Sequence, residues 1–481
     1  MQPTHILLLI ACYFLVLMGI SYFTGRSGSN SDFFKASGKS PWYLVAFGMI
    51  GASLSGVTFI SVPGWVEASS FSYFQVVLGY TVGYAVIGLV LLPLYYRLNL
   101  TSIYTYLDDR FGKYSYKTGA SFFLLSRIVG ASFRLYLVAN VLQFLVFDSL
   151  GIDFWITVTL TIILIWLYTY RAGIKTIVWT DTLQTLFMLL AVGVAIYFVS
   201  VDLKLDGGSL FSLIAESDLS KMFFFDDPKS KDFFFNQFIS GAFIAIVMTG
   251  LDQDMMQKNL TCRNLKDAQK NMFWFTIVLT FVNLLFLALG LLLTVYAEQN
   301  GITASKDALF PYIATQEGLG FGIGIFFILG LIAAAYSSAD SALTALTTSF
   351  SIDILEIEKK YSPDKQIKLR KIIHVAISLI LIFVIIFFKY VIADDSVIAK
   401  IFVWAGYTYG PLLGLYSYGL FSNWQVMDKW VPVVCLFSPI LAYTISEFSL
   451  NFLAFEFGFF ILILNGLLTF LGLVLIRTQQ N

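Results

Sequence analysis

The sequence predicts an all-α protein that crosses a membrane many times, and two observations support this fold class. Hydrophobic residues make up 58% of the 481 residues and charged residues only 12%, whereas soluble domains usually carry about 25% charged residues. Apolar runs of about 18 residues or more recur along the chain, and each is long enough to cross a bilayer as a helix. We therefore expect a multi-pass protein of the plasma (inner) membrane, surrounded by the lipid bilayer and without a nucleic-acid partner.

The few cysteines and histidines argue against several cofactor classes. Cys12, Cys262 and Cys435 are isolated in the sequence, which argues against a disulfide framework or a metal cluster. His5 and His374 are the two histidines, too few for a membrane oxidase that holds haem or copper through several of them. No Lys or Arg precedes the first apolar run, so we expect a retained first helix rather than a cleaved signal peptide.

The apolar runs predict about thirteen membrane helices. Their expected spans are 5–23, 42–66, 72–97, 116–147, 152–169, 175–201, 236–256, 271–298, 319–352, 370–391, 396–421, 430–447 and 451–476. The longest polar connection, 202–235, is too short to fold as an independent domain. No separate soluble unit is therefore expected.

The positions of lysine and arginine predict the orientation of the chain. If the N-terminus lies outside, most of these residues fall in loops on the inside, as they do in other membrane proteins. We therefore expect the N-terminus outside and the C-terminus inside, which agrees with an odd number of helices. The acidic, phenylalanine-rich segment 202–235 would then form an external cap.

The expected helix 319–352 carries hydroxyls and a carboxylate at membrane depth. Ala334, Ser337, Ser338 and Ser341 fall within about a 100° arc of one helix face, and Asp340 flanks that arc. A membrane offers these groups no water, so the face must meet protein, a polar cavity or an ion. For the serines alone, close helix packing is the simpler interpretation.

The second expected helix contains an interruption. The stretch from Gly48 to Thr58 crowds glycines and hydroxyls into the middle of the membrane. A helix of this composition can unwind, and its freed carbonyls then need a partner. A sodium ion is one such partner in transporters. The alternative is a glycine-rich helix crossing.

Two other expected helices carry charges that bear on function: Arg127 and Arg134 in one, and Asp181 in the other. Arg127 and Arg134 are seven residues apart and so share a face of helix 116–147. A guanidinium binds carboxylates in a bidentate manner, which suggests an anionic solute, although a structural ion pair with an intramembrane acid is the alternative. Asp181, near Gln184 in helix 175–201, needs a cation, an arginine or a proton.

With these residues in hand, the chain resembles the sodium:solute symporter family, and its motifs are most similar to those of sialic-acid and carboxylate transporters. The matching stretches are Asp32–Phe34, Ser55–Phe59, Tyr104–Phe111, Trp179–Gln184, Ala334–Ser341 and Gly410–Tyr416. The resemblance implies a LeuT-type fold with two five-helix repeats of opposite topology. These would span 42–201 and 236–421, with a peripheral helix and cytoplasmic loop at 1–41, the external loop 202–235 between them, and two peripheral helices in 422–481.

The resemblance also implies sodium ligands. The family's main sodium site takes three carbonyls and two hydroxyls, which correspond here to Gly51, Leu54, Ala334, Ser337 and Ser338. Five neutral oxygens suit a hard monovalent cation. Some members bind a second sodium through an aspartate that matches Asp181 and through hydroxyls such as that of Ser341. Asp340 stands where sialic-acid symporters have a serine, so this second site could hold sodium, a proton or an ion pair with an arginine.

For the solute, the resemblance points to the broken helix and to helix 116–147. Hydroxyls that line the family's pocket match Ser53, Ser55 and Thr58. Sialic-acid members use an arginine for the substrate carboxylate; Arg134 fits its placement, and Arg127 is the second candidate. Tyr80 stands where those members have a glutamine, which counts against sialic acid specifically.

We therefore expect a sodium-coupled symporter, acting as a monomer, that imports a small organic anion such as a sialic acid or another carboxylate by alternating access. A neutral sugar is the alternative solute. An ion channel would need a continuous water-lined path, whereas most of these helices are uniformly apolar. A membrane enzyme would need a nucleophile and base, and neither histidine lies on a motif helix, so no enzymatic activity is expected.

Overall fold

The computed structural model describes residues 3–24, 33–34, 36–170, 173–315, 319–391, 397–453 and 455–478. Asp32 of the first motif lies outside them. The helices are α1 Pro3–Thr24, α3 Trp42–Ser53, α4 Gly56–Ser69, α5 Tyr73–Val86, α6 Leu92–Arg97, α7 Thr105–Arg110, α8 Lys113–Leu142, α9 Phe154–Thr169, α10 Ile174–Asp202, α11 Gly207–Glu216, α12 Phe234–Ala245, α13 Gln253–Asn259, α14 Leu265–Asn300, α15 Leu309–Thr315, α16 Phe321–Ser349, α17 Ile357–Lys360, α18 Pro363–Val391, α19 Val397–Phe421, α20 Val431–Leu453 and α21 Ile461–Leu475. Two short strands, β1 Gln425–Val426 and β2 Arg477–Thr478, pair in an antiparallel manner.

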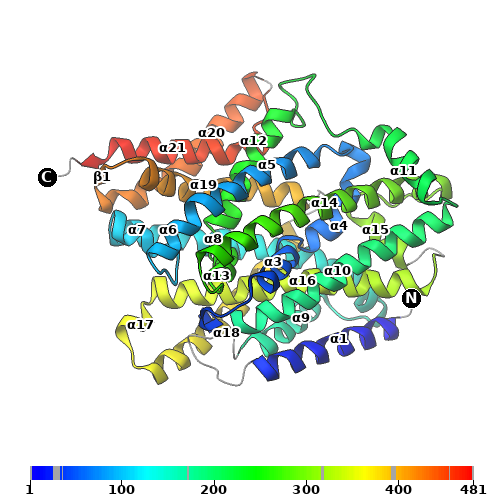
Figure 1. The fold of residues 1–481 in the computed structure, drawn as a ribbon, viewed down its shortest axis with the longest axis horizontal. Coiled ribbons are helices and arrows are strands. Elements are labelled where there is room, and N and C mark those ends of the chain that lie inside the picture. The colour runs from blue at the N-terminus through cyan, green and yellow to red at the C-terminus, as the bar shows by residue number, and fades with distance from the viewer. Residues whose placement is uncertain are drawn as a thin grey trace.

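Most of the long helices run along the long axis of the molecule, and the two termini lie at opposite ends of it (Figure 1). Among the described residues, nine helices are long and apolar enough to cross a membrane, or eleven if two bent pairs each count as one span. Helices α9 and α19 cover the other two expected spans. Several helix boundaries differ from the expected ones. For example, α18 begins at Pro363 rather than near residue 370.

The interruption predicted in the second helix is confirmed. Helix α3 ends at Ser53, Leu54 and Ser55 lie outside any helix, and α4 continues from Gly56 at an angle of 55° to α3. The glycines of α3 allow it to approach α10 closely. A Cβ at Gly48 would lie 3.0 Å from that of Asp181, and one at Gly51 would overlap the side chain of Thr185.

A second break was not predicted. The expected helix 236–256 is α12, a π-helical turn over Ile246–Gly250, and then α13, which is bent by 69° from the first part. Asp252 caps α13 by accepting a hydrogen bond from the backbone N–H of Asp254 at 2.8 Å. An aspartate shortly after a glycine, at the end of an apolar run, is a helix-start signal. We expected one unbroken helix because Met255 and Met256 extend the apolar character past Asp252.

Helices α5 and α12 cross at glycines that face the partner helix. A Cβ at Gly79 would clash with the carbonyl oxygen of Phe238, and one at Gly241 would clash with that of Val76. The neighbouring atoms are backbone and have little freedom to move, so close approach at this crossing depends on the absence of side chains.

We expect Gly79→Ala to lower the free energy of unfolding by about 1–3 kcal/mol, the usual cost of overpacking a tight contact. The measurement is the thermal unfolding temperature of the purified protein in detergent. Gly193→Ala is the matched control, because a Cβ there meets nothing within 4 Å. Equal shifts for the two variants would contradict the steric role of Gly79.

The segment 202–235 folds over the end of the molecule that also carries the N-terminus (Figure 1). It contains α11, whose first turn is capped by Asp206. Hydrogen bonds from the backbone and side chain of Ser209 lower the pKa of Asp206. Gln75 of α5 holds the segment in place, donating to Asp232 O at 2.9 Å and accepting from Phe224 N at 3.1 Å.

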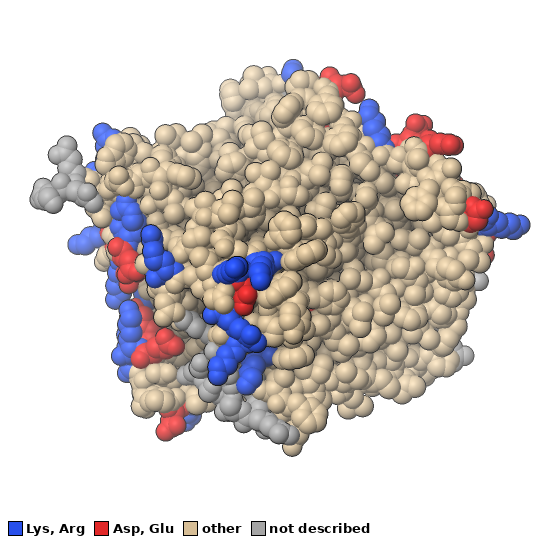
Figure 2. Space-filling model, viewed as in Figure 1, with Lys and Arg blue, Asp and Glu red and all other residues tan. Residues whose placement is uncertain are grey.

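Lysine and arginine gather at the opposite end of the visible face, near the C-terminus (Figure 2). At the connection between α16 and α18, Lys117 donates to Glu356 and to the carbonyl of Ile354 at 3.1 Å. The hydrogen bond from Lys117 lowers the pKa of Glu356, and nearby lysines add to the effect. These contacts attach α8 to the polar end of α16.

Candidate functional site

A cavity lies where the two helix breaks meet α5, α8 and α14. All six residues expected to bind the solute line it: Ser53, Ser55, Thr58, Tyr80, Arg127 and Arg134. The structure therefore brings together side chains from three expected helices that are far apart in the sequence. Because all six residues line the same cavity, they are consistent with a single solute pocket. The two arginines, however, have different neighbours.

Arg127 is balanced by two carboxylates from the second break. Its Nη2 donates to Asp254 Oδ2, and its Nη1 lies 3.7 Å from Asp252 Oδ2. Asp252 also accepts a hydrogen bond from the hydroxyl of Tyr409 on α19. These side chains are all buried. The structural ion pair that the sequence left open as an alternative is therefore present at Arg127.

Arg134 lies two helical turns further along α8 and has no such balance. It is half-buried, it lines the same cavity, and no carboxylate of the described residues lies within ion-pair distance of it. A guanidinium at membrane depth is costly unless it meets an anion, water or polar groups. Arg134 is thus placed to bind a carboxylate that enters the cavity.

Tyrosines, an amide and a threonine complete the lining. The hydroxyls of Tyr73 and Tyr80 are 3.2 Å apart, and Tyr84, Thr249 and Asn283 also face the cavity. Asn283 was not a candidate from the sequence. An asparagine inside the apolar α14 was the available signal, because amides at membrane depth need a polar partner. Its Nδ2 donates to Leu279 O at 2.8 Å.

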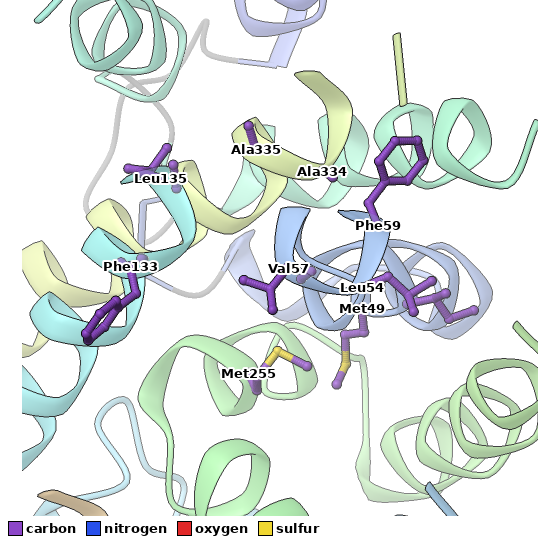
Figure 3. Close-up of a cluster of buried hydrophobic side chains, with 14 of the residues drawn as sticks. Met49, Leu54, Val57, Phe59, Phe133, Leu135, Met255, Ala334 and Ala335 are labelled. Carbon is purple, nitrogen blue, oxygen red and sulfur yellow. The ribbon is translucent and has the colours of Figure 1, made fainter. Parts of the chain in front are cut away.

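The residues expected at the main sodium site lie where α16 packs against the first break. Figure 3 shows Ala334 of α16 across from Leu54, Val57 and Phe59. Because α3 ends at Ser53, its last carbonyls lack intrahelical donors. The amide of Leu54 satisfies Ile50 O at 2.8 Å, which leaves the carbonyls of Gly51 and Leu54 to other partners.

The two serines of this set differ. Ser338 Oγ is buried and has no hydrogen-bond partner among the described residues. Ser337 Oγ donates to Asp181 Oδ1 at 2.8 Å. A hydroxyl that donates its proton keeps lone pairs that can still ligate a cation. Both serines therefore have an oxygen to offer.

The candidate second cation site is divided between two sets of contacts. Asp181 is held by Ser337 and by Lys258, whose Nζ lies 2.8 Å from Asp181 Oδ2. Asp340 Oδ2 instead accepts a hydrogen bond from the hydroxyl of Tyr168 at 2.7 Å. Ser341 Oγ is buried without a partner among the described residues.

Lys258 was not a candidate from the sequence because it follows the seventh expected helix, 236–256, where a loop was expected. The second break turns α13 into the protein and carries Lys258 with it. The available signal was the four-residue spacing between Asp254 and Lys258, which is typical of one helix face.

Comparison with known proteins identifies the family. The sequence profile of the sodium:solute symporter family matches residues 33–423. The chain belongs to this family. The sodium/sialic acid symporter SiaT of Proteus mirabilis is 26% identical over 424 residues, which cover 85% of this chain and 82% of the relative. NanT of Aliivibrio fischeri, also a sodium/sialic acid symporter, is 26% identical over 422 residues, covering 83% and 79%.

Solved structures share the fold. A substrate-bound, outward-open Na⁺-coupled sialic acid symporter matches with a TM-score of 0.82, at 22% identity and with 99% of each chain covered. A nucleobase–cation symport-1 family transporter matches with a TM-score of 0.53, at 14% identity, covering 92% of this chain and 94% of the other. The chain is therefore a multi-pass, sodium-coupled symporter for a small-molecule solute, with sodium as its coupling ion.

Proposed function

We propose that this symporter imports a small organic anion by alternating access, with a sialic acid as the first candidate solute. The observation that carries this proposal is Arg134, a cavity-lining arginine without a carboxylate partner among the described residues. Arg127, in the same cavity, already has its partners. The solute carboxylate would bind Arg134, and transport would involve no covalent chemistry.

The remainder of the cavity suits a hydroxyl-bearing solute. Ser53, Ser55 and Thr58 offer hydroxyls from the first break, and Asn283 offers an amide from α14. Such groups can exchange hydrogen bonds with several hydroxyls of an acidic sugar. The similarity to SiaT and NanT supports the same solute class. Tyr80, in place of the expected glutamine, would adapt the pocket to a different member of that class.

The proposed architecture is a LeuT-type pair of inverted repeats, 42–201 and 236–421. The bent pairs α3–α4 and α12–α13 each begin one of these repeats, which supports the assignment. The basic end of the molecule would face the cytoplasm and the end with α11 the exterior, so the N-terminus lies outside and the C-terminus inside. Since one chain contains the whole cavity, a monomer in the plasma membrane would suffice.

Sodium would bind to the carbonyls of Gly51, Leu54 and Ala334 and to the hydroxyls of Ser337 and Ser338. The ion would thereby join the first break to α16. Because Ser53 and Ser55 belong to the same break, sodium would also order the solute cavity. Coupling then arises from binding free energy that the two sites share.

A thermal-shift screen with purified protein tests the solute class. Sialic acids, monocarboxylates, amino acids and neutral sugars are added with sodium or with an equimolar salt of a larger cation. A ligand that binds only the folded state raises the unfolding temperature. We expect a sodium-dependent rise with a carboxylate-bearing sugar. A rise with neutral sugars alone would contradict the anionic solute.

A further inference from the structure

Lys258 lies deep in the protein beside the carboxylate of the candidate second cation site. Its side chain is 2% exposed, that of Asp181 is 0% exposed, and Lys258 Nζ lies 2.8 Å from Asp181 Oδ2. The ammonium group of a lysine near a membrane boundary normally extends toward water. Here α13 packs against α10 and α16, and the ammonium points into the protein.

We propose that the ammonium group of Lys258 takes the place of a second sodium ion, so that this symporter binds one sodium ion per transport cycle. The inference rests on the proposed function and deepens it, because it concerns how many coupling ions the same machinery uses. In effect the chain carries its own second cation, attached to α13.

Contacts on two sides fix the position of this ammonium group. Asp181 faces it on α10, and Asp254 Oδ1 lies 4.0 Å from it on α13. The other oxygen of Asp254 is held by Arg127, and the other oxygen of Asp181 accepts the hydrogen bond from Ser337. These five side chains are almost completely buried. Lys258 therefore has no route to a solvated position without leaving both carboxylates.

A sodium ion bound to Asp181 would stand next to this ammonium group. Two like charges a few ångströms apart repel strongly where little water screens them. Displacing Lys258 instead would leave a buried ammonium without its closest carboxylate, which is unfavourable. Both routes disfavour sodium at Asp181, so the main site alone would hold the coupling ion.

Asp340 is held from α9 through one of its two oxygens. Its Oδ2 accepts the hydrogen bond from Tyr168, and its Oδ1 has no hydrogen-bond partner among the described residues. The hydroxyl of Ser341 is buried without a partner among the described residues, and Asp181 and Ser337 already lie in contact. Removing the ammonium group would therefore leave a set of oxygens around a free carboxylate, which is the environment that a sodium ion requires.

The test is the number of sodium ions bound by the purified full-length protein, measured with radiolabelled sodium at equilibrium in detergent. We expect one ion per chain for the wild type and two for Lys258→Met, which keeps an unbranched side chain of similar length and removes its charge. Lys270→Met, a change to an exposed lysine at the start of α14, should bind one. Two ions for the wild type, or one for a folded Lys258→Met protein, would overturn the proposal.

A double variant covers the case in which Lys258→Met alone fails to fold. Lys258→Met with Asp181→Asn removes both charges of the pair and should bind one sodium ion, as the wild type does; two ions would overturn the proposal. The count is independent of solute identity. One bound sodium ion without uptake of any carboxylate would contradict the proposed solute and leave the role of Lys258 intact. Two bound sodium ions with carboxylate uptake would contradict the role of Lys258 and leave the proposed solute intact.

Discussion

Replacing Arg134 by alanine is expected to lower the affinity for a carboxylate-bearing solute by about 100-fold or more. Each hydrogen bond to a charged group contributes about 1.5–3 kcal/mol, and a bidentate contact makes two of them. About 1.4 kcal/mol corresponds to a tenfold change in affinity. The fold should remain stable, because Arg134 is half-buried and has no carboxylate partner among the described residues. The measurement is solute binding to purified protein by calorimetry, together with uptake into proteoliposomes.

Arg127→Ala is the matched control on the same helix face. It would leave Asp252 and Asp254 buried without their cation, and breaking a buried pair in this way costs about 3–5 kcal/mol. We therefore expect a lower unfolding temperature for Arg127→Ala and an unchanged one for Arg134→Ala. A stable Arg127→Ala protein that has lost carboxylate binding, with Arg134→Ala binding normally, would show that the solute uses the other arginine.

Replacing Ser337 and Ser338 together by alanine is expected to abolish the stimulation of uptake by sodium. The pair supplies two of the five oxygens assigned to the main sodium site, and a cation that loses ligands in a dry site has no water to replace them. The protein should still reach the membrane. The measurement is uptake into proteoliposomes as a function of sodium concentration.

The single variants separate the two hydroxyls. Ser338 Oγ has no hydrogen-bond partner among the described residues, so Ser338→Ala should affect sodium affinity without affecting stability. Ser337→Ala also removes a hydrogen-bond donor to Asp181, and we expect it to lower both the sodium affinity and the stability of the protein. Ser200→Ala serves as a control, because this buried hydroxyl is also unpartnered among the described residues but lies near the far end of α10. Unchanged sodium dependence in the double variant would rule out the site.

The solute cavity shows how far a single sequence can be interpreted. Ser53, Ser55 and Thr58 were predicted from the resemblance to the family, whose pocket hydroxyls they match, and they line the cavity. Arg127 and Arg134 lie seven residues apart on one helix face, and in the sequence only the resemblance to the family favoured Arg134. The position of Asp252 and Asp254, which come from another helix, shows that Arg127 is already paired. No local pattern contains that information.

The second break and Lys258 illustrate the same limit. Hydropathy predicted an apolar segment at 236–256 correctly, but it does not register a change of direction inside such a segment. The bend of 69° turns α13 inward and places Lys258 against Asp181. From the sequence alone, Lys258 cannot be distinguished from a lysine in a cytoplasmic loop.

The sequence by itself determined the all-α membrane class, the approximate positions of the apolar helices and the first break. These properties depend on hydropathy and on local backbone preferences, which neighbouring residues encode. The tertiary structure decided which charges are already paired and which are free to bind a ligand. Ion pairing depends on distances between helices that are remote in sequence, and it is this pairing that distinguishes Arg134 from Arg127 and gives Asp181 its lysine.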